Sequence, residues 1–248
     1  MSANSAALQA LIFDVDGTLA DTERDGHRPA FNAAFREAGL DWHWDEALYG
    51  ELLAVTGGKE RIARYAARFA PEWLAAPDAQ RRIGELHARK NAHYAAIAEA
   101  GELRLRPGLP ALFDALAASG IRLAIATTTS RANVDVLLRT CLGAESASRF
   151  EVIVCGEDVA RKKPDPEAYV LALHRLGLPA SRCVAVEDSA NGLRAALGAG
   201  IATLIVRSLY TQTEDFSGAR AVFDGYADGQ AAAGDARVLS AALIGAIA

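Results

Sequence analysis

Residues 10–18 read Ala-Leu-Ile-Phe-Asp-Val-Asp-Gly-Thr, and this stretch decides the fold. The apolar run ends in Asp-Gly, which is typical of a buried strand that enters a turn. On an extended backbone Asp14 and Asp16 share a face. Two carboxylates so close repel each other unless a cation or a shared proton relieves them, and Mg²⁺ takes such oxygen ligands. For this motif alone, a plain strand followed by an Asp-Gly turn is the alternative.

Further apolar segments alternate with amphipathic ones along the chain. We predict strands at Ala10–Val15, Ile121–Thr128, Phe150–Cys155, Arg182–Glu187 and Ala202–Val206. We predict helices near 109–119, 131–142, 166–176 and 191–199, and a packed C-terminal helix within Gly229–Ala248 that uses Val238, Leu239, Leu243 and Ile244. Continuous apolar strands between helices indicate an α/β fold with a Rossmann-like parallel sheet covered on both faces.

The segment from about residue 20 to residue 101 breaks this alternation because it contains no strand-like run. It predicts four helices, at Asp25–Ala38, Asp45–Leu53, Lys59–Ala70 and Ala79–Ala100. We therefore expect an all-helical domain at 20–102, inserted into a core domain at 1–19 and 103–248. Its two joints are expected near Leu19–Thr22 and Gly101–Gly108.

Composition restricts the class of protein. The chain has 248 residues, of which 51% are hydrophobic and 23% charged, and this excludes disorder as the main state. A net charge of −5 argues against sequence-independent nucleic-acid binding, which needs a basic face. Three unpaired-looking cysteines indicate a reducing compartment. With no signal-like N-terminus and no apolar run near the ~20 residues that span a bilayer, we expect a cytoplasmic monomer without membrane or nucleic-acid partners.

Polar residues follow the other predicted strands, at the edge of the sheet where ligands of such folds bind. These residues are Thr127–Ser130, Lys163 within Arg161–Pro166, and Glu187–Ser189. Taken singly, each has a structural explanation: Ser130 and Ser189 or Asp188 cap helices, and the lysine lies in a solvated turn. A structural explanation is much less plausible for the combination, in which an acid pair, a hydroxyl, a lysine and a second acid pair follow successive strands of one sheet.

At these residues the chain resembles the haloacid dehalogenase-like superfamily. Residues 14–18 resemble its first motif, Thr127 the second, Lys163 the third and Glu187-Asp188 the fourth, and the helical insert resembles its cap. The segments Asp21–Arg28 and Lys162–Pro166 further resemble CbbY-like phosphatases. A common family form has glycine where this chain has Lys162.

The resemblance implies a role for each motif residue. Asp14 is the expected nucleophile, which becomes an aspartyl-phosphate, and Asp16 the expected acid and base. Mg²⁺ is the expected cofactor, with Asp14, the Asp16 carbonyl and Asp188 as ligands; Glu187 either binds it through water or orients its ligands. Thr127 and Lys163 are expected to hold the phosphoryl oxygens.

The expected substrate contacts lie mostly in the insert. The segment Gly57-Gly58-Lys59-Glu60-Arg61 combines a glycine turn with two cations, which suits an anion, although a turn before a solvated helix explains it equally well. His27 faces the site or packs in the cap. The full predicted set is Glu23, His27, Gly57, Gly58, Lys59, Arg61, Thr128, Arg131 and Asn133.

The resemblance implies a sugar-phosphate phosphatase, and specifically the conversion of xylulose-1,5-bisphosphate to xylulose 5-phosphate and phosphate. Two phosphates suit a site with a Mg²⁺ pole and a basic pole. A phosphomutase of the β-phosphoglucomutase kind shares all four motifs and is the first alternative. A phosphoglycolate or general sugar-phosphate phosphatase is the second, and a non-catalytic binding protein on the same fold is the third.

Overall fold

A computed structural model describes residues 8–227, 238–241 and 244, and a parallel sheet of six strands forms its centre. The strands are β1 (Ala10–Phe13), β2 (Arg122–Ala126), β3 (Val152–Val154), β4 (Cys183–Glu187), β5 (Ala202–Val206) and β6 (Ala221–Phe223). Their order is β3-β2-β1-β4-β5-β6, so β1 lies between β2 and β4, with Leu11 opposite both Leu123 and Val184. This order brings the carboxyl ends of β1, β2 and β4 together.

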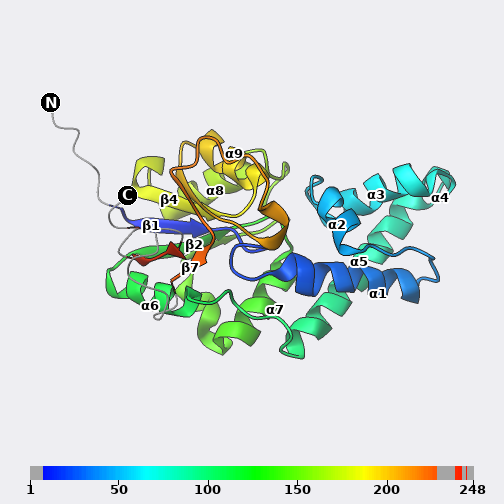
Figure 1. The fold of residues 1–248 in the computed structure, drawn as a ribbon, viewed down its shortest axis with the longest axis horizontal. Coiled ribbons are helices and arrows are strands. Elements are labelled where there is room, and N and C mark those ends of the chain that lie inside the picture. Colours follow the sequence, from blue (N-terminus) through cyan, green and yellow to red (C-terminus); the bar gives the residue numbers. More distant parts are fainter. Residues whose placement is uncertain (1–7, 228–237, 242–243, 245–248) are drawn as a thin grey trace.

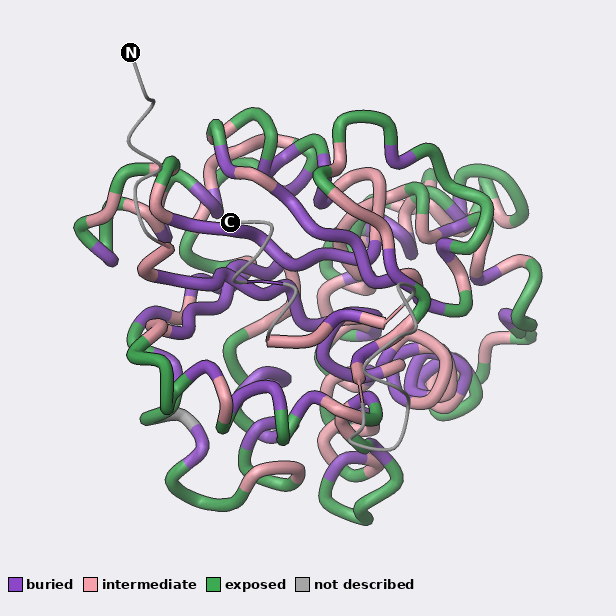
Figure 2. Tube along the Cα trace, turned by 60° about the vertical axis from the view of Figure 1, so that its left-hand side comes forward, coloured by how far each residue is buried: buried purple, intermediate pink, exposed green. Residues whose placement is uncertain are grey.

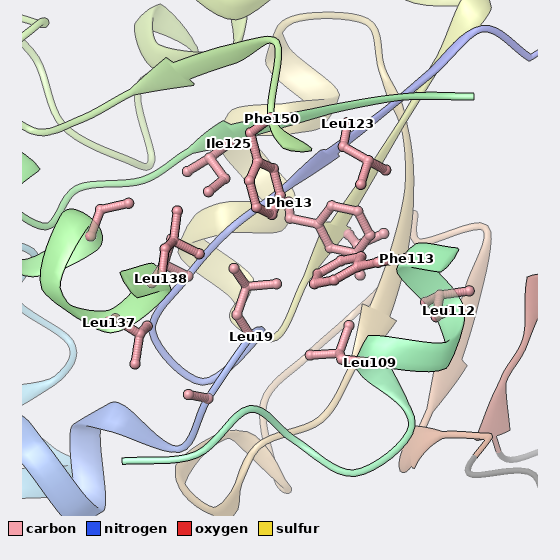
Figure 3. Close-up of a cluster of buried hydrophobic side chains, with 14 of the residues drawn as sticks. Phe13, Leu19, Leu109, Leu112, Phe113, Leu123, Ile125, Leu137, Leu138 and Phe150 are labelled. Atoms are coloured by element: carbon pink, nitrogen blue, oxygen red, sulfur yellow. The ribbon is translucent and has the colours of Figure 1, made fainter. Parts of the chain in front are cut away.

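Helices cover both faces of the sheet (Figure 1). They are α6 (Leu109–Ala118) and α7 (Arg131–Leu142) on one face, and α8 (Glu167–Leu176) and α9 (Ala190–Gly198) on the other. Successive side chains of a strand point to opposite faces of the sheet, so in β1 Leu11 and Phe13 face α6 and α7, whereas Ala10 and Ile12 face α8 and α9. Figure 3 shows the larger core, where the ring of Phe113 packs edge-to-face on that of Phe13 at 5.4 Å between centroids.

A wholly helical segment lies between β1 and β2, at one end of the molecule in Figure 1. It consists of the π-helical turn η1 (Glu23–His27), α1 (Arg28–Glu37), α2 (Glu46–Leu52), α3 (Gly58–Phe69), α4 (Pro71–Ala75) and α5 (Ala79–Glu99). It has an aromatic-rich core of its own, which includes Phe31, Phe35 and Trp44. Figure 2 shows the buried strands at the centre of the molecule. The predicted fold class, a parallel α/β sheet with a helical insert, is confirmed.

Several details differ from the sequence-based expectation. The helix expected from Asp25 begins as a π turn, and α4 and β6 were not expected. The predicted C-terminal helix is wrong for Val238 and Leu239, which form strand β8 against β7 (Gly225–Tyr226). Leu239 is nevertheless fully buried, because an apolar residue serves a core equally in either conformation. Most of the remaining C-terminal prediction, Leu243 included, lies outside the described residues.

The two connections between helical segment and sheet run side by side. Ala20 pairs with Leu105 in an antiparallel bridge, and the Arg106 amide donates to the Leu19 carbonyl at 2.8 Å. The chain thus leaves and re-enters the sheet layer at one place, next to the end of β1. Among the described helices, none is both long enough and apolar enough to cross a bilayer.

Candidate active site

Lys163 ties the ends of three strands together. Its Nζ donates to Asp14 Oδ1 at 2.6 Å, to the Ala126 carbonyl at 2.8 Å and to Glu187 Oε1 at 2.5 Å. Tyr169 of α8 donates a further hydrogen bond to Glu187 Oε1 at 2.6 Å. Because Asp14 follows β1, Ala126 ends β2 and Glu187 ends β4, the parallel sheet itself creates this arrangement. The predicted grouping of Asp14, Lys163 and Glu187 is present.

Asp14, Glu187 and Asp188 place carboxylate oxygens within 4.8 Å of one another, and all three are buried. Burial, opposed by Lys163 and assisted by the charges of Glu187 and Asp16, raises the pKa of Asp14 to about 8. Burial, together with Asp14 and Glu187, also raises the pKa of Asp188 well above its usual range. One lysine is insufficient for this much negative charge. An oxygen-only cluster of this kind fits Mg²⁺, which would relieve the repulsion.

The turn after Asp16 is shaped to lie against this cluster. Gly17 has φ of 86°, a conformation that favours glycine, and a Cβ there would lie 2.1 Å from Asp188 Oδ2. Thr18 Oγ1 donates to Asp188 Oδ1 at 3.5 Å. The Asp-Gly motif therefore brings the backbone of the first motif directly onto the acid pair of the fourth.

Asp16 has a separate set of partners. Its Oδ1 accepts from Thr22 Oγ1 at 2.6 Å and lies 2.9 Å from His27 Nε2, and His27 Nδ1 lies 2.7 Å from Lys90 Nζ. As an ammonium, Lys90 donates to Nδ1, so His27 donates to Asp16 through Nε2. Although burial opposes it, this set, led by His27, lowers the pKa of Asp16 to about 2. His27 also stacks on Tyr94 at 4.3 Å between ring centroids.

A cavity of about 470 Å³ lies between the helical segment and the strand ends. A second, of about 100 Å³, lies next to it at Asp14, Lys163 and Asp188, and Asp16 lines both. Of the predicted substrate residues, the larger cavity is lined by Glu23, His27, Gly57, Gly58, Lys59, Arg61, Thr128 and Asn133. Lys162 and His87 line it as well.

Arg61 is not a free cation. It is 6% exposed, and its Nη1 donates to Tyr49 Oη at 2.7 Å and to Glu23 Oε2 at 3.5 Å. Tyr49 in turn donates to Glu23 Oε2. The buried Tyr49 and Arg61 and the partly buried Glu23 thus form one hydrogen-bonded unit at the cavity wall.

The double glycine lies in a closely packed turn. A Cβ on Gly57, whose φ is 100°, would lie 2.2 Å from Glu60 Oε2, and a Cβ on Gly58 would lie 2.6 Å from His87. Glu60 Oε1 accepts from Lys162 Nζ at 2.8 Å, which joins the helical segment to the loop that carries Lys163. Lys162 is therefore a bridging residue at the cavity rim.

Some of the residues that follow β2 line the cavities, and others do not. Thr127 is buried and accepts from the Thr129 amide at 3.3 Å, whereas Thr128 lines both cavities. Asn133 Nδ2 donates to Thr129 Oγ1 at 3.2 Å. Arg131 is not brought to the cavity: its Nε donates to Asp135 at 2.8 Å, since that carboxylate lies one turn further along α7.

The sequence interpretation missed Tyr49, His87 and Lys90. A signal existed for Lys90: it lies at i+4 from Leu86 and i−4 from Tyr94 on the buried face of α5, where an unpaired lysine is costly. Burial, with the positive charges of Lys90, Lys59 and Lys162, lowers the pKa of His87 to about 4. The part of the cavity wall around His87 is consequently electropositive, and it favours the neutral form of this histidine.

Comparison with known proteins gives a consistent result. Residues 8–200 match the profile of haloacid dehalogenase-like hydrolases. CbbY of Cupriavidus necator is 50% identical over 86% of this chain and 83% of its own length. The crystal structure of a CbbY mutant from Rhodobacter sphaeroides, in complex with xylulose-(1,5)bisphosphate, superposes with a TM-score of 0.80 at 46% identity, covering 88% of this chain and 94% of that one. With the motif residues gathered at one sheet edge, these matches show that the chain belongs to the haloacid dehalogenase-like hydrolases, as a phosphatase related to CbbY.

Proposed function

We propose that this sugar phosphatase hydrolyses xylulose-1,5-bisphosphate to xylulose 5-phosphate and phosphate with the help of Mg²⁺. The observation that carries the proposal is the two-pole site. An acid cluster at Asp14 and Asp188 adjoins a cavity whose lining includes the cations Lys59 and Lys162. A ligand with a phosphate at each end matches that charge distribution. The crystallised complex of the related CbbY with this bisphosphate supports the same substrate.

Asp14 acts as the nucleophile in the proposed first step. A carboxylate oxygen forms a bond to phosphorus, the ester bond between phosphorus and the sugar oxygen breaks, and the leaving alkoxide takes a proton from Asp16. Lys163, at 2.6 Å from Asp14 Oδ1, favours the ionised carboxylate that this attack needs. Thr127 and Lys163 would hold the phosphoryl oxygens.

Asp16 changes role in the second step. It takes a proton from water, the water oxygen bonds to phosphorus, and the bond between phosphorus and Asp14 breaks, so that phosphate leaves and the carboxylate is regenerated. His27 donates to Asp16 through Nε2 and keeps the carboxylate aimed at the cavity. The earlier, acid role of Asp16 in the first step requires its carboxyl group to be protonated when substrate is bound, and the negative charge of the phosphate favours that protonation.

Mg²⁺ would be held by Asp14, Asp188 and the Asp16 carbonyl, with Glu187 contacting it through water or orienting its ligands. When bound it would offset the negative charges of the nucleophile and phosphate, so that they can approach. Glu187 already has two partners, Lys163 and Tyr169, which fits an orienting role.

The helical segment at 20–102 is proposed as a cap over a core at 1–19 and 103–248. In this arrangement Glu23 would accept a sugar hydroxyl, while Lys59 and the amides of Gly57-Gly58 would meet the distal phosphate. Arg61 would act indirectly, by holding Glu23 and Tyr49.

A substrate panel tests the proposal. Sugar monophosphates, sugar bisphosphates and phosphoglycolate are incubated with enzyme and Mg²⁺, and phosphate release and sugar products are measured together. The proposal predicts the highest kcat/KM for xylulose-1,5-bisphosphate, with xylulose 5-phosphate formed in equal amount to phosphate. An isomeric bisphosphate without phosphate release would identify a mutase instead, and a preference for phosphoglycolate would overturn the substrate assignment.

A further inference from the structure

We infer that Arg106 is a positioning residue that fixes the Asp16-Gly17-Thr18 turn from behind and anchors the second joint of the helical segment. Arg106 lies in the returning connection, between α5 and α6 and outside every family motif, and the residue is 9% exposed. The inference rests on the proposed function, because it assigns Arg106 to the geometry of the first motif.

The Arg106 guanidinium is shared by four backbone carbonyls from three parts of the chain. Nη1 donates to Gly17 at 2.8 Å and to Val206 at 3.0 Å, while Nη2 donates to Arg207 at 2.7 Å and to Asp224 at 3.4 Å. Gly17 belongs to the catalytic turn, Val206 and Arg207 to the end of β5, and Asp224 to the connection after β6. Arg106 thus joins the turn to the far half of the sheet.

The turn that Arg106 holds touches the catalytic acids. Gly17 lies so close to Asp188 that no side chain fits between them. A second restraint comes from Tyr226, whose hydroxyl donates to the Thr18 carbonyl at 3.0 Å and whose ring lies 5.5 Å below the Arg106 guanidinium. A shift of the Gly17 carbonyl would therefore move the backbone of the first motif relative to Asp188.

The same residue anchors the joint. Its own amide donates to the Leu19 carbonyl, and its neighbour Leu105 pairs with Ala20 of the outgoing connection. The returning connection is consequently fixed to the sheet layer from residue 105 onward. On the returning side, any movement of the helical segment must therefore be accommodated between α5 and residue 105.

Arginine is needed at this position for a geometric reason. A planar guanidinium offers five N–H donors in a fixed fork, whereas a lysine presents three donors from one atom. A lysine would reach only some of the four carbonyls, because two of them accept from one arm of the guanidinium fork and two from the other. Among the described residues Arg106 makes no ion pair, so its charge is balanced by these carbonyl dipoles.

Two variants and a control test the inference. Arg106→Lys retains the charge but loses the fork, and Tyr226→Phe removes only the hydrogen bond to Thr18. Arg122→Lys is the matched control. Arg122 also donates to a carbonyl, that of Leu176 at 2.8 Å, but it is the first residue of β2 and so lies at the end of this strand away from the catalytic turn. We measure kcat and KM below the unfolding midpoint, and amide hydrogen exchange in substrate-free protein.

Arg106→Lys is expected to lower kcat by ~10- to 100-fold, the effect of displacing a catalytic geometry by about 1 Å, with KM changed less than ~threefold. Exchange should accelerate at residues 17–20, and Tyr226→Phe should act in the same direction but less. Arg122→Lys should change neither.

Exchange that accelerates evenly over the sheet, with kcat unchanged, would show Arg106 to be an ordinary stabilising residue and overturn the inference. Because exchange needs no substrate, it decides the question even if xylulose-1,5-bisphosphate proves not to be hydrolysed.

Discussion

Replacing Lys59 with methionine should impair the enzyme toward a bisphosphate but not toward a monophosphate. Lys59 lines the larger cavity and is exposed, and its ammonium makes no hydrogen bond or ion pair within the described part of the chain. Its ammonium is therefore free to meet the distal phosphate of a bound ketose bisphosphate. A monophosphate lacks that group and never makes the contact.

The expected magnitude follows from the exposure of Lys59. A hydrogen bond to a charged group contributes ~1.5–3 kcal/mol, and each 1.4 kcal/mol is about tenfold in kcat/KM. Water competes at an exposed lysine, so we expect the lower end, about a tenfold loss for the bisphosphate.

Arg61→Ala should behave differently, although Arg61 belongs to the same sequence segment. It leaves the buried Tyr49 and the partly buried Glu23 without their cation, and breaking a buried pair costs ~3–5 kcal/mol of stability. Both substrates should be affected.

The assay compares kcat/KM for xylulose-1,5-bisphosphate and for xylulose 1-phosphate, which keeps the reacting phosphate but lacks the distal one, across Lys59→Met, Arg61→Ala and the control Arg64→Met. Arg64 is an exposed cation of α3 that does not line the cavity. Equal losses on both substrates with Lys59→Met would refute the distal-phosphate reasoning and indicate a role in folding of the segment. No loss on either would make the segment a solvated turn.

Three further predictions concern the metal, the buried lysine and the glycine turn. EDTA should abolish phosphate release and Mg²⁺ restore it, while Ca²⁺ should inhibit because its larger coordination shell misplaces the nucleophile; full activity in EDTA would exclude the metal assignment. Lys90→Met should lower kcat by ~10- to 100-fold, since His27 loses the donor that fixes its tautomer. Burial lowers the pKa of Lys90 from 10.5 to about 8, so the folded wild-type protein holds an unfavourable buried charge below pH 8. Lys90→Met should therefore unfold at a higher temperature than wild type below pH 8, and this difference should disappear as the pH rises toward 10.5. An unchanged melting curve at pH 7 would contradict the buried charge. Gly57→Ala should lower the free energy of unfolding by ~1–3 kcal/mol, because φ of 100° strains alanine; chemical denaturation against wild type measures it, and an unchanged midpoint would show that the turn adapts.

The sheet and its ligand edge were predictable because their signals are local. Each central strand is a continuous apolar run, and Asp14, Lys163 and Glu187 follow such runs or the turns after them. Strand order then brings these residues together without any further information. By contrast, β6 has only three residues and pairs on one side, so its apolar signal is too short to distinguish from a loop.

The polar partners in the helical segment were hidden because their contacts are distant in sequence. His27 and Lys90 are 63 residues apart, and Arg61 and Glu23 are 38 apart. A glycine turn with two cations, residues 57–61, indicated an anion site, but only packing shows that Arg61 is already bound while Lys59 faces the cavity. Side-chain geometry of this kind depends on how helices dock, which periodicity does not encode.

The most direct test of the central claim follows phosphate and xylulose 5-phosphate during incubation of xylulose-1,5-bisphosphate with Mg²⁺ and either wild-type protein or Asp14→Asn. Wild-type protein should give one phosphate and one xylulose 5-phosphate per substrate molecule, whereas an amide at position 14 cannot attack phosphorus. We therefore expect no turnover with Asp14→Asn, and we expect this variant still to fold and to bind the bisphosphate. Phosphate release by Asp14→Asn above a few per cent of the wild-type rate would contradict an aspartyl-phosphate at Asp14.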